Sequence, residues 1–170
     1  MSRPARLIWL LVLYGALGIV AWSQGAVRWP GWLIRSQASE LASLTRHIDN
    51  NSEDGRAHAL RADHWLDQDD FLRASLDLQR ALEAGYLEPP VHNNLAWSLA
   101  HLGRFQEALP LAREAVARQR ASYSLDTLAF VQAGLGNREQ ALELYRQALA
   151  LDPTNNEIRI NRATLLRARP

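Results

Sequence analysis

The chain has 170 residues, of which 48% are hydrophobic, a length and composition sufficient for the core of a domain. It contains no cysteine, which excludes disulfides, thiolate zinc sites and cysteine nucleophiles. All 19 basic residues are arginine, and four of them fall in the first 35 residues, which hold no acidic residue. The remainder therefore carries 15 arginines against 18 acidic residues, a net charge of −3, and does not fit the positive surface that nucleic acid binding requires.

An uncharged segment of 21 residues, 7–27, follows a short N-terminal tail at 1–6 and has the sequence LIWLLVLYGALGIVAWSQGAV. As a helix it would be about 30 Å long, which matches the hydrocarbon core of a bilayer. Trp22, Trp29 and Trp32 lie where an aromatic belt would meet the lipid headgroups. We therefore predict an uncleaved transmembrane helix. The alternative is a signal peptide that is removed at the small residues of AWS or SQG.

Positive charges flank this segment on both sides. Arg3, Arg6 and the terminal amine oppose Arg28 and Arg35, so the positive-inside rule slightly favours a cytoplasmic N-terminus and an exported remainder. A basic composition made of arginine alone is typical of a bacterium with a GC-rich genome. These features predict a single-pass protein of the bacterial inner membrane whose following domain is periplasmic.

Within the segment, small residues recur along one helical stripe formed by Gly15, Gly18, Trp22 and Gly25. Small residues let two membrane helices approach closely, so the stripe is a candidate surface for packing against a helix of a partner membrane protein. The alternative is the high glycine content that membrane helices commonly have.

Residues 28–54 are predicted to be a linker that contains an amphipathic helix. Leu41, Leu44 and Ile48 have the spacing of one helical face, and the polar sequence DNNSEDG ends the helix.

From residue 55 the chain repeats itself at intervals of 34 and 33 residues. Alanines mark the register in two sets, which are Ala74, Ala108 and Ala141, and Ala81, Ala115 and Ala148. Members of the two sets lie seven residues apart within each repeat, so both fall on one face of a helix.

The repeats resemble the tetratricopeptide repeat, a helix-turn-helix unit of about 34 residues. The positions that match the family pattern are Leu95, Ala96, Leu128 and Ala129 in the first helices, Gly103 and Gly136 at the turns, Ala108, Ala141 and Tyr145 in the second helices, and Pro153 after the last of them. One departure is Asp69, which stands where the turn glycine belongs in the first repeat, and we expect a looser turn there.

The resemblance implies an all-α protein in which the transmembrane helix is followed by a short α-solenoid. The solenoid would span 55–170, with repeats at 55–88, 89–121 and 122–155 and a capping helix at 156–170. In this family the first helices line a concave face that binds segments of other proteins. The corresponding residues here are Asn93, Asn94, Trp97, His101, Tyr123, Asp126, Thr127, Phe130 and Asn161.

Among these residues Asn94 is the strongest candidate for contact with a peptide backbone, because an amide both donates and accepts hydrogen bonds. Trp97 and Phe130 would be apolar anchors, although the same aromatic residues, and Tyr123, could instead pack between repeats. Chaperone-binding members of the family grip a terminal carboxylate with basic residues and an asparagine. The corresponding positions here are Ala59, Asp63, Asn94, Tyr123 and Thr127, so that ligand is not expected.

Catalytic patterns find little support in the sequence. The five histidines form no pair with zinc-binding helical spacing, and GxSxG and phosphate-loop motifs are absent. Asp67, Asp69 and Asp70 offer oxygen ligands for a cation, but they lack the glycine and the distal glutamate of a calcium loop. We expect no enzyme, cofactor or small-molecule substrate, and keep a cation-binding protein or small enzyme as a minor alternative.

The combined prediction is a membrane-anchored scaffold or assembly subunit of a bacterial envelope complex. It would contact the lipid bilayer and one or more proteins, among them a membrane protein. A soluble periplasmic peptide-binding module, released by signal-peptide cleavage, is the alternative.

Overall fold

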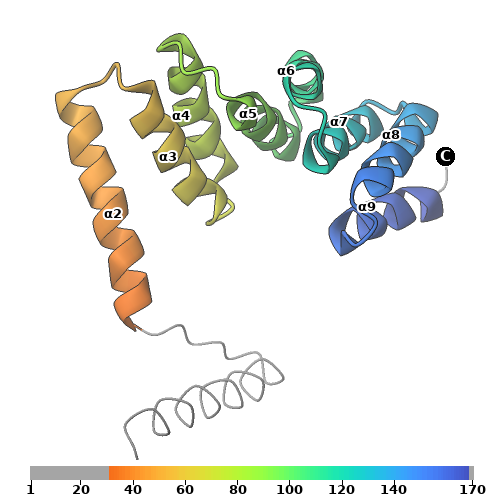
Figure 1. The fold of residues 1–170 in the computed structure, drawn as a ribbon, viewed down its shortest axis with the longest axis horizontal. Coiled ribbons are helices and arrows are strands. Elements are labelled where there is room, and N and C mark those ends of the chain that lie inside the picture. The colour runs from red at the N-terminus through yellow and green to blue at the C-terminus, as the bar shows by residue number, and fades with distance from the viewer. Residues whose placement is uncertain (1–30, 169–170) are drawn as a thin grey trace, which may run out of the picture. The chain divides into compact units, whose positions relative to one another are not determined.

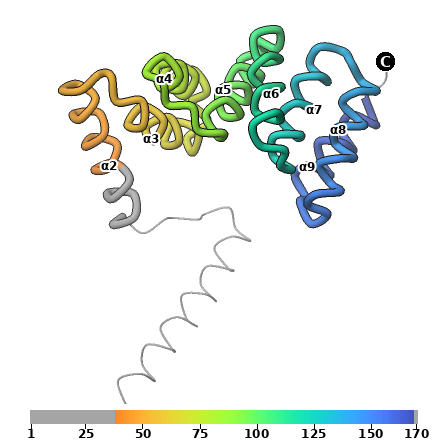
Figure 2. The backbone as a smooth tube through the Cα atoms, turned by 45° about the horizontal axis from the view of Figure 1, so that its top comes forward, coloured from red at the N-terminus to blue at the C-terminus, as the bar shows by residue number. Residues whose placement is uncertain are grey.

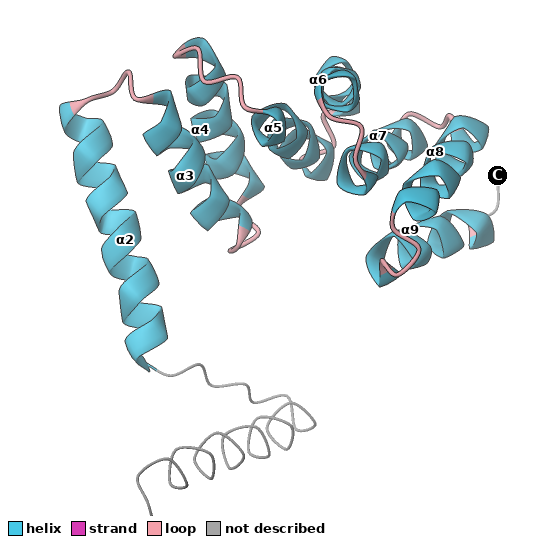
Figure 3. Cartoon of the chain, viewed as in Figure 1, coloured by secondary structure: helices cyan, strands magenta, loops and turns pink. Residues whose placement is uncertain are grey.

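The computed structural model describes residues 31–168 and contains only helices, turns and loops within that range (Figure 3). The helices are α2 (Gly31–Asn50), α3 (Gly55–Leu66), α4 (Phe71–Glu83), α5 (Pro89–His101), α6 (Phe105–Arg118), α7 (Ser122–Gly134), α8 (Arg138–Leu151) and α9 (Asn156–Arg167). The described residues divide into two units between Glu40 and Leu41, and the fold of the unit that begins at Leu41 is described below.

Within 31–168 no helix combines the length and apolar character needed to cross a bilayer. The membrane helix predicted at 7–27, and with it the stripe of Gly15, Gly18, Trp22 and Gly25, lies outside the described residues.

The helices from α3 onward form three antiparallel pairs, α3 with α4, α5 with α6 and α7 with α8, and α9 lies against α8 (Figures 1 and 2). Each pair packs on the next, because α4 contacts α5 and α6 contacts α7. The first helices also contact one another, α5 with α7 and α7 with α9. This arrangement is an α-solenoid, and we call the face formed by its first helices, α3, α5, α7 and α9, the groove, because the first helices line the inner face of such solenoids.

Local sequence explains where several helices begin. Asp54 and Asp70 accept hydrogen bonds from the backbone amides three residues later, at 3.0 Å in both cases, and so cap the N-termini of α3 and α4. Asn155 caps α9 in the same way. α5 begins at Pro89, where the missing amide hydrogen costs no helical bond.

Alanines occupy the crossings between paired helices, as the register predicted. All six are at most 1% exposed, and they are Ala74, Ala81, Ala108, Ala115, Ala141 and Ala148. A methyl side chain at these points lets the two backbones approach closely. The repeats and their register are therefore confirmed in the structure.

The turns inside the three pairs have one geometry. Gly103 and Gly136 have positive φ angles of 75° and 82°, and Asp69 has a φ of 56° at the equivalent place. The next amide closes each turn on a carbonyl oxygen five residues earlier, at 2.9, 2.8 and 2.9 Å for Asp70 to Trp65, Arg104 to Leu99 and Asn137 to Gln132. The expectation of a looser first turn is wrong, because aspartate is one of the few residues besides glycine that tolerate this conformation.

Candidate protein-binding groove

Four rings from three helices are in mutual contact where the end of α5 meets α4 and α7, and we call them the aromatic cluster: Phe71, Trp97, His101 and Phe130. The His101 ring stacks on Phe71 at a centroid distance of 4.2 Å and on Phe130 at 5.1 Å. Trp97, one turn earlier on α5, lies 4.3 Å from His101 and 5.3 Å from Phe130. Trp97 and Phe130 are half-buried, so these rings pack between repeats and still present part of their surface.

Amide and carboxylate groups join neighbouring first helices on either side of the aromatic cluster. Asn94 on α5 donates to Asp63 on α3 at 3.3 Å, and Asn161 on α9 donates to Asp126 on α7 at 3.5 Å. Asn93 donates to the side-chain oxygen of Asn94 at 3.4 Å, which makes a chain of three groups. The Oδ1 atom of Asn93 is buried and has no hydrogen-bond partner among the described residues.

Burial shifts the proton affinities of these groups. Desolvation raises the pKa of Asp126 to about 6, against an opposing hydrogen bond from Asn161 and with a further rise from the charge of Glu157. Desolvation also raises the pKa of Asp63, with Asn94 opposing and Asp67 adding to the rise. The groove therefore holds carboxyl groups that are incompletely compensated in the unbound chain.

His101 experiences the same acidic surroundings. Partial desolvation, of the kind that its stacked rings cause, lowers the pKa of the exposed His101, while the charges of Asp69 and Glu157 act in the opposite direction. Of the described charged groups that act on the pKa of Asp63, His101 or Asp126, every one is a carboxylate except His64.

A small cleft of about 120 Å³ opens between α3 and α5 beside Asn94. Its walls are mainly apolar, with the carboxylates of Asp63 and Glu88 at the edge. Such a cleft is large enough for one side chain of a bound segment.

The nine residues predicted to line the groove differ in accessibility. His101 and Tyr123 are exposed, and Asn94, Trp97, Phe130 and Asn161 are half-buried. Asn93, Asp126 and Thr127 are buried, and the Thr127 hydroxyl donates to the carbonyl oxygen of Tyr123 in its own helix. The exposed and half-buried residues can touch a partner directly, whereas Asn93 and Asp126 act through their hydrogen-bonded neighbours. Contact with a partner remains a prediction for all nine.

Phe71 belongs to the aromatic cluster but was not predicted from the sequence. It is the first residue of α4, directly after the acidic turn, and reaches His101 because the turn returns the chain to the end of the neighbouring pair. The acidic residues of that turn have structural roles, since Asp70 caps α4 and Asp69 adopts the positive φ angle. In the described part of the chain, no three His, Asp or Glu side chains are grouped so as to hold a metal ion.

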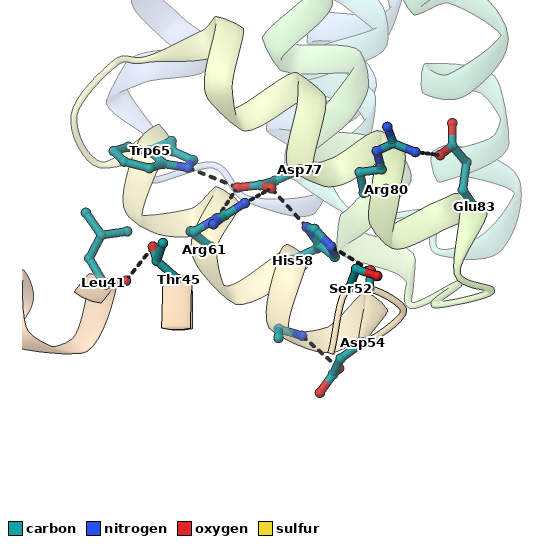
Figure 4. Close-up of polar contacts among 11 residues, drawn as sticks. Leu41, Thr45, Ser52, Asp54, His58, Arg61, Trp65, Asp77, Arg80 and Glu83 are labelled. Carbon is teal, nitrogen blue, oxygen red and sulfur yellow. Dashed lines mark hydrogen bonds and ion pairs between the residues drawn. The ribbon is translucent and has the colours of Figure 1, made fainter. Parts of the chain in front are cut away.

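A second set of polar residues lies between α3 and α4 (Figure 4). We call His58, Arg61, Trp65 and Asp77 the α3–α4 network, and it was not predicted from the sequence. Buried Asp77 on α4 accepts two hydrogen bonds from Arg61, at 2.8 and 2.7 Å, and one from the Trp65 indole at 3.0 Å. His58 is a further partner of Asp77: its Nδ1 atom lies 3.0 Å from Asp77 Oδ1, and its Nε2 atom lies 3.0 Å from the Ser52 carbonyl oxygen. Burial raises the pKa of Asp77, but the hydrogen bonds from Arg61, His58 and Trp65 outweigh it and hold the pKa below its usual range.

His58, Arg61 and Trp65 stand three and four residues apart on one face of α3, opposite a single aspartate among the apolar positions of α4. That spacing is the sequence signal that could have revealed the network. The α3–α4 network joins the two helices of the first repeat and so stabilises their packing, and none of its residues belongs to the aromatic cluster.

The fold defines an α-solenoid repeat protein. Tetratricopeptide repeat family models match residues 93–126 and 122–155, so this part of the chain consists of tetratricopeptide repeats. A comparison with curated proteins finds no match.

Solved structures of similar fold are tetratricopeptide proteins with low sequence identity. YrrB, a protein with an unusual peptide-binding site, aligns over 78% of this chain and 69% of its own, with 18% identity and a TM-score of 0.67. MamA from Desulfovibrio magneticus RS-1 aligns over 90% and 81%, with 16% identity and a TM-score of 0.68. The first repeat domain of Spaghetti (RPAP3), bound to the HSP90 peptide SRMEEVD, aligns over 69% and 94%, with 19% identity and a TM-score of 0.60. At these identities the likeness establishes the fold.

Proposed function

We propose that this protein is a membrane-anchored scaffold that holds a segment of a partner protein in the groove formed by α3, α5, α7 and α9. The observation that carries the proposal is the aromatic cluster, because Trp97 and Phe130 keep exposed surface at the junction of two repeats. Partly exposed aromatic rings in a concave surface are the usual anchors of protein interfaces. Peptide binding by YrrB and by the Spaghetti (RPAP3) domain supports the same use of the fold.

The anchor in this proposal is the uncharged segment 7–27, and its glycine stripe would pack against a partner helix in the bilayer. The flanking arginines favour repeats on the periplasmic side, and the arginine-only composition favours a bacterial envelope complex. The second candidate is a soluble periplasmic peptide-binding module. It is favoured by the small residues of AWS and SQG, which could serve as a signal-peptide cleavage site.

Site-specific photo-crosslinking in the cells that naturally produce the protein tests the groove. A photoreactive residue at Tyr123, which is 39% exposed on the first helix α7, is expected to give a crosslinked partner. The same probe at Arg113, exposed on the second helix α6, is the control and is expected to give none.

The variant Trp97→Ala completes this test. It is expected to abolish the Tyr123 crosslink while the chain retains its cooperative unfolding transition. An undiminished crosslink in a folded Trp97→Ala chain, or equal crosslinks from Tyr123 and Arg113, would refute partner binding in the groove.

A further inference from the structure

The aromatic cluster is surrounded by negative charge. Asp69 and Glu157 act electrostatically on His101, which is one of its four rings. Asp63 and Asp126 flank the cluster on α3 and α7, and Asp67 adds to the field at Asp63. The charge comes from five carboxylates on four separate segments of the chain, so it is a property of the assembled groove and of no single acidic run.

The same surface has an excess of hydrogen-bond acceptors. Asp63 and Asp126 each receive one side-chain hydrogen bond from the described residues, and these bonds are long, at 3.3 and 3.5 Å. An ionised carboxylate has capacity for about four. Asn93 donates its amide hydrogen to Asn94, and its own buried Oδ1 atom accepts no hydrogen bond from any residue that the structure describes. Among the described residues, the side-chain acceptors of this face therefore exceed the donors bonded to them, and the exposed Asp63 is open to N–H groups of a ligand.

An aromatic ring face and a neighbouring carboxylate together form a binding site for a cationic side chain. A guanidinium or ammonium group is attracted to the face of a tryptophan or phenylalanine ring and pairs with a carboxylate at the same time. Trp97 and Phe130 lie 5.3 Å apart at their centroids and are half-buried. Asp126 stands one helical turn before Phe130 on α7, and Asn94, which is bonded to Asp63, stands one turn before Trp97 on α5, so the carboxylates and the rings share one face.

We propose that the groove is specific for a basic segment of a partner protein, whose arginine or lysine side chains lie on Trp97 and Phe130, pair with the exposed Asp63, and are attracted by the charge of the buried Asp126. This inference rests on the proposed function and names the chemistry of the partner. Arginine suits the site better than lysine, because its planar fork both stacks on rings and donates several hydrogen bonds. An acidic ligand such as SRMEEVD, the peptide bound by the Spaghetti (RPAP3) domain, would meet like charges here.

Three fluorescent peptides of one sequence test the proposal. Each has twelve residues, with arginine at four positions in the first peptide, glutamine in the second and glutamate in the third. Binding to the full 170-residue chain, purified in a mild non-ionic detergent, is measured by fluorescence anisotropy. We expect the arginine peptide to bind at least about tenfold more tightly than the glutamine peptide, to weaken as salt is raised, and the glutamate peptide to bind least.

Variants locate the binding. Asp63→Asn combined with Asp126→Asn keeps shape and amide hydrogen bonding but removes both charges, and should weaken the arginine peptide at least about tenfold while leaving the glutamine peptide unchanged. Trp97→Leu keeps an apolar side chain but removes the ring face, and should also weaken the arginine peptide. Glu139→Gln, on the second helix α8, removes an exposed carboxylate outside the groove and is the matched control.

The outcomes separate this inference from the proposed function. The inference of a basic partner is overturned if the three peptides bind equally, if the glutamate peptide binds more tightly, or if no peptide binds. The crosslinking at Tyr123 then decides the proposed function by itself. Binding of the arginine peptide that the double variant and Glu139→Gln weaken equally also overturns it, because the attraction would then be to the net charge of the chain.

Discussion

At the scale of single residues, the turn at Asp69 shows that backbone conformation can be preserved when the usual residue is not. Asp69 has the same positive φ region as Gly136, and the hydrogen bond that closes the turn has the same length in both, 2.9 Å. A residue with a Cβ atom pays a conformational cost here that glycine does not. The family pattern therefore identifies residue 69 as the turn position, and the structure shows that aspartate there keeps the positive φ angle of the usual glycine.

We expect Asp69→Gly to raise the free energy of unfolding by about 0.5 kcal/mol, because relief of the positive φ outweighs the added freedom of the unfolded chain. Gly136→Ala should lower it by about 1 kcal/mol, since a Cβ at Gly136 would meet no atom within 4 Å and only the φ angle opposes it. Urea denaturation measures both. Asp69→Ala is the control that removes the same carboxylate but keeps the positive φ, and it should not stabilise the chain.

Asp126 gives the groove a measurable pH dependence. Its pKa in the folded chain is raised to about 6 from an ordinary value of 3.8, so folding favours the protonated form. This contribution to stability is complete below pH 3.8 and is lost as the pH rises through about 6. The charged groups facing Asp126 include Glu157 on α9, and Tyr145 on α8 lies near enough to feel its charge.

We therefore expect Asp126→Asn to stabilise the protein at pH 7.5 by up to about 3 kcal/mol and to have little effect near pH 4, as about two pKa units correspond to this energy. Thermal unfolding of the variant and the unmodified chain across this pH range measures the difference. A difference in Tm that is constant with pH would contradict the raised pKa.

At the scale of helices and pairs, the sequence predicted most of the fold. The two alanine sets at intervals of 34 and 33 residues identified the helix crossings, because only a small side chain fits where two backbones meet. The α3–α4 network was not predicted, since the partner of Asp77 depends on which face of α3 is turned toward α4. Hydrophobic spacing treats His58 and Arg61 as surface residues, and the structure places His58 in the interior.

The alanine crossings predict a cost of enlargement. Ala141 is completely buried on α8, and Ala141→Leu should lower the free energy of unfolding by about 1–3 kcal/mol or more by overpacking the contact with α7. Ala150→Leu, at an exposed position of the same helix, is the matched control and should be nearly neutral. Chemical denaturation compares them, and an equal effect of both changes would mean that Ala141 does not sit at a close crossing.

The α3–α4 network predicts a cost of deletion. Asp77→Ala would leave the buried His58 and the half-buried Arg61 without their acceptor, and should lower the free energy of unfolding by about 3–5 kcal/mol. Glu83→Ala, which breaks the exposed pair with Arg80 on the same helix, should cost less than about 1 kcal/mol. If the two variants unfolded at the same urea concentration, the network would not fasten α3 to α4.

At the scale of the whole molecule, the groove emerges from contacts that no single repeat contains. Trp97, His101 and Phe130 were predicted to share a face, but Phe71 joins them only because α4 begins beside the end of α5. The pairing of Asn161 with Asp126 likewise spans two first helices that are 35 residues apart in the chain. Sequence register thus predicts which residues line the groove, whereas their burial and mutual hydrogen bonds depend on how the pairs stack.

The anchor proposed at 7–27 determines where this groove would act, and it can be tested separately from the groove. Replacing Leu17 and Ile19 by arginine places two charges in the middle of the segment, where each costs about 2.5–3.5 kcal/mol on insertion scales. We expect the double variant to appear in the soluble fraction, or to be degraded, while the unmodified chain stays with membranes after carbonate extraction. Gln79→Arg, an exposed change on α4, should leave the chain in the membrane.

Intact mass gives the second measurement, because an uncleaved chain retains its full 19.1 kDa. A mature form that lacks about 23 N-terminal residues would replace the anchor by the soluble periplasmic module, and the partner segment would then be one that reaches the protein in solution.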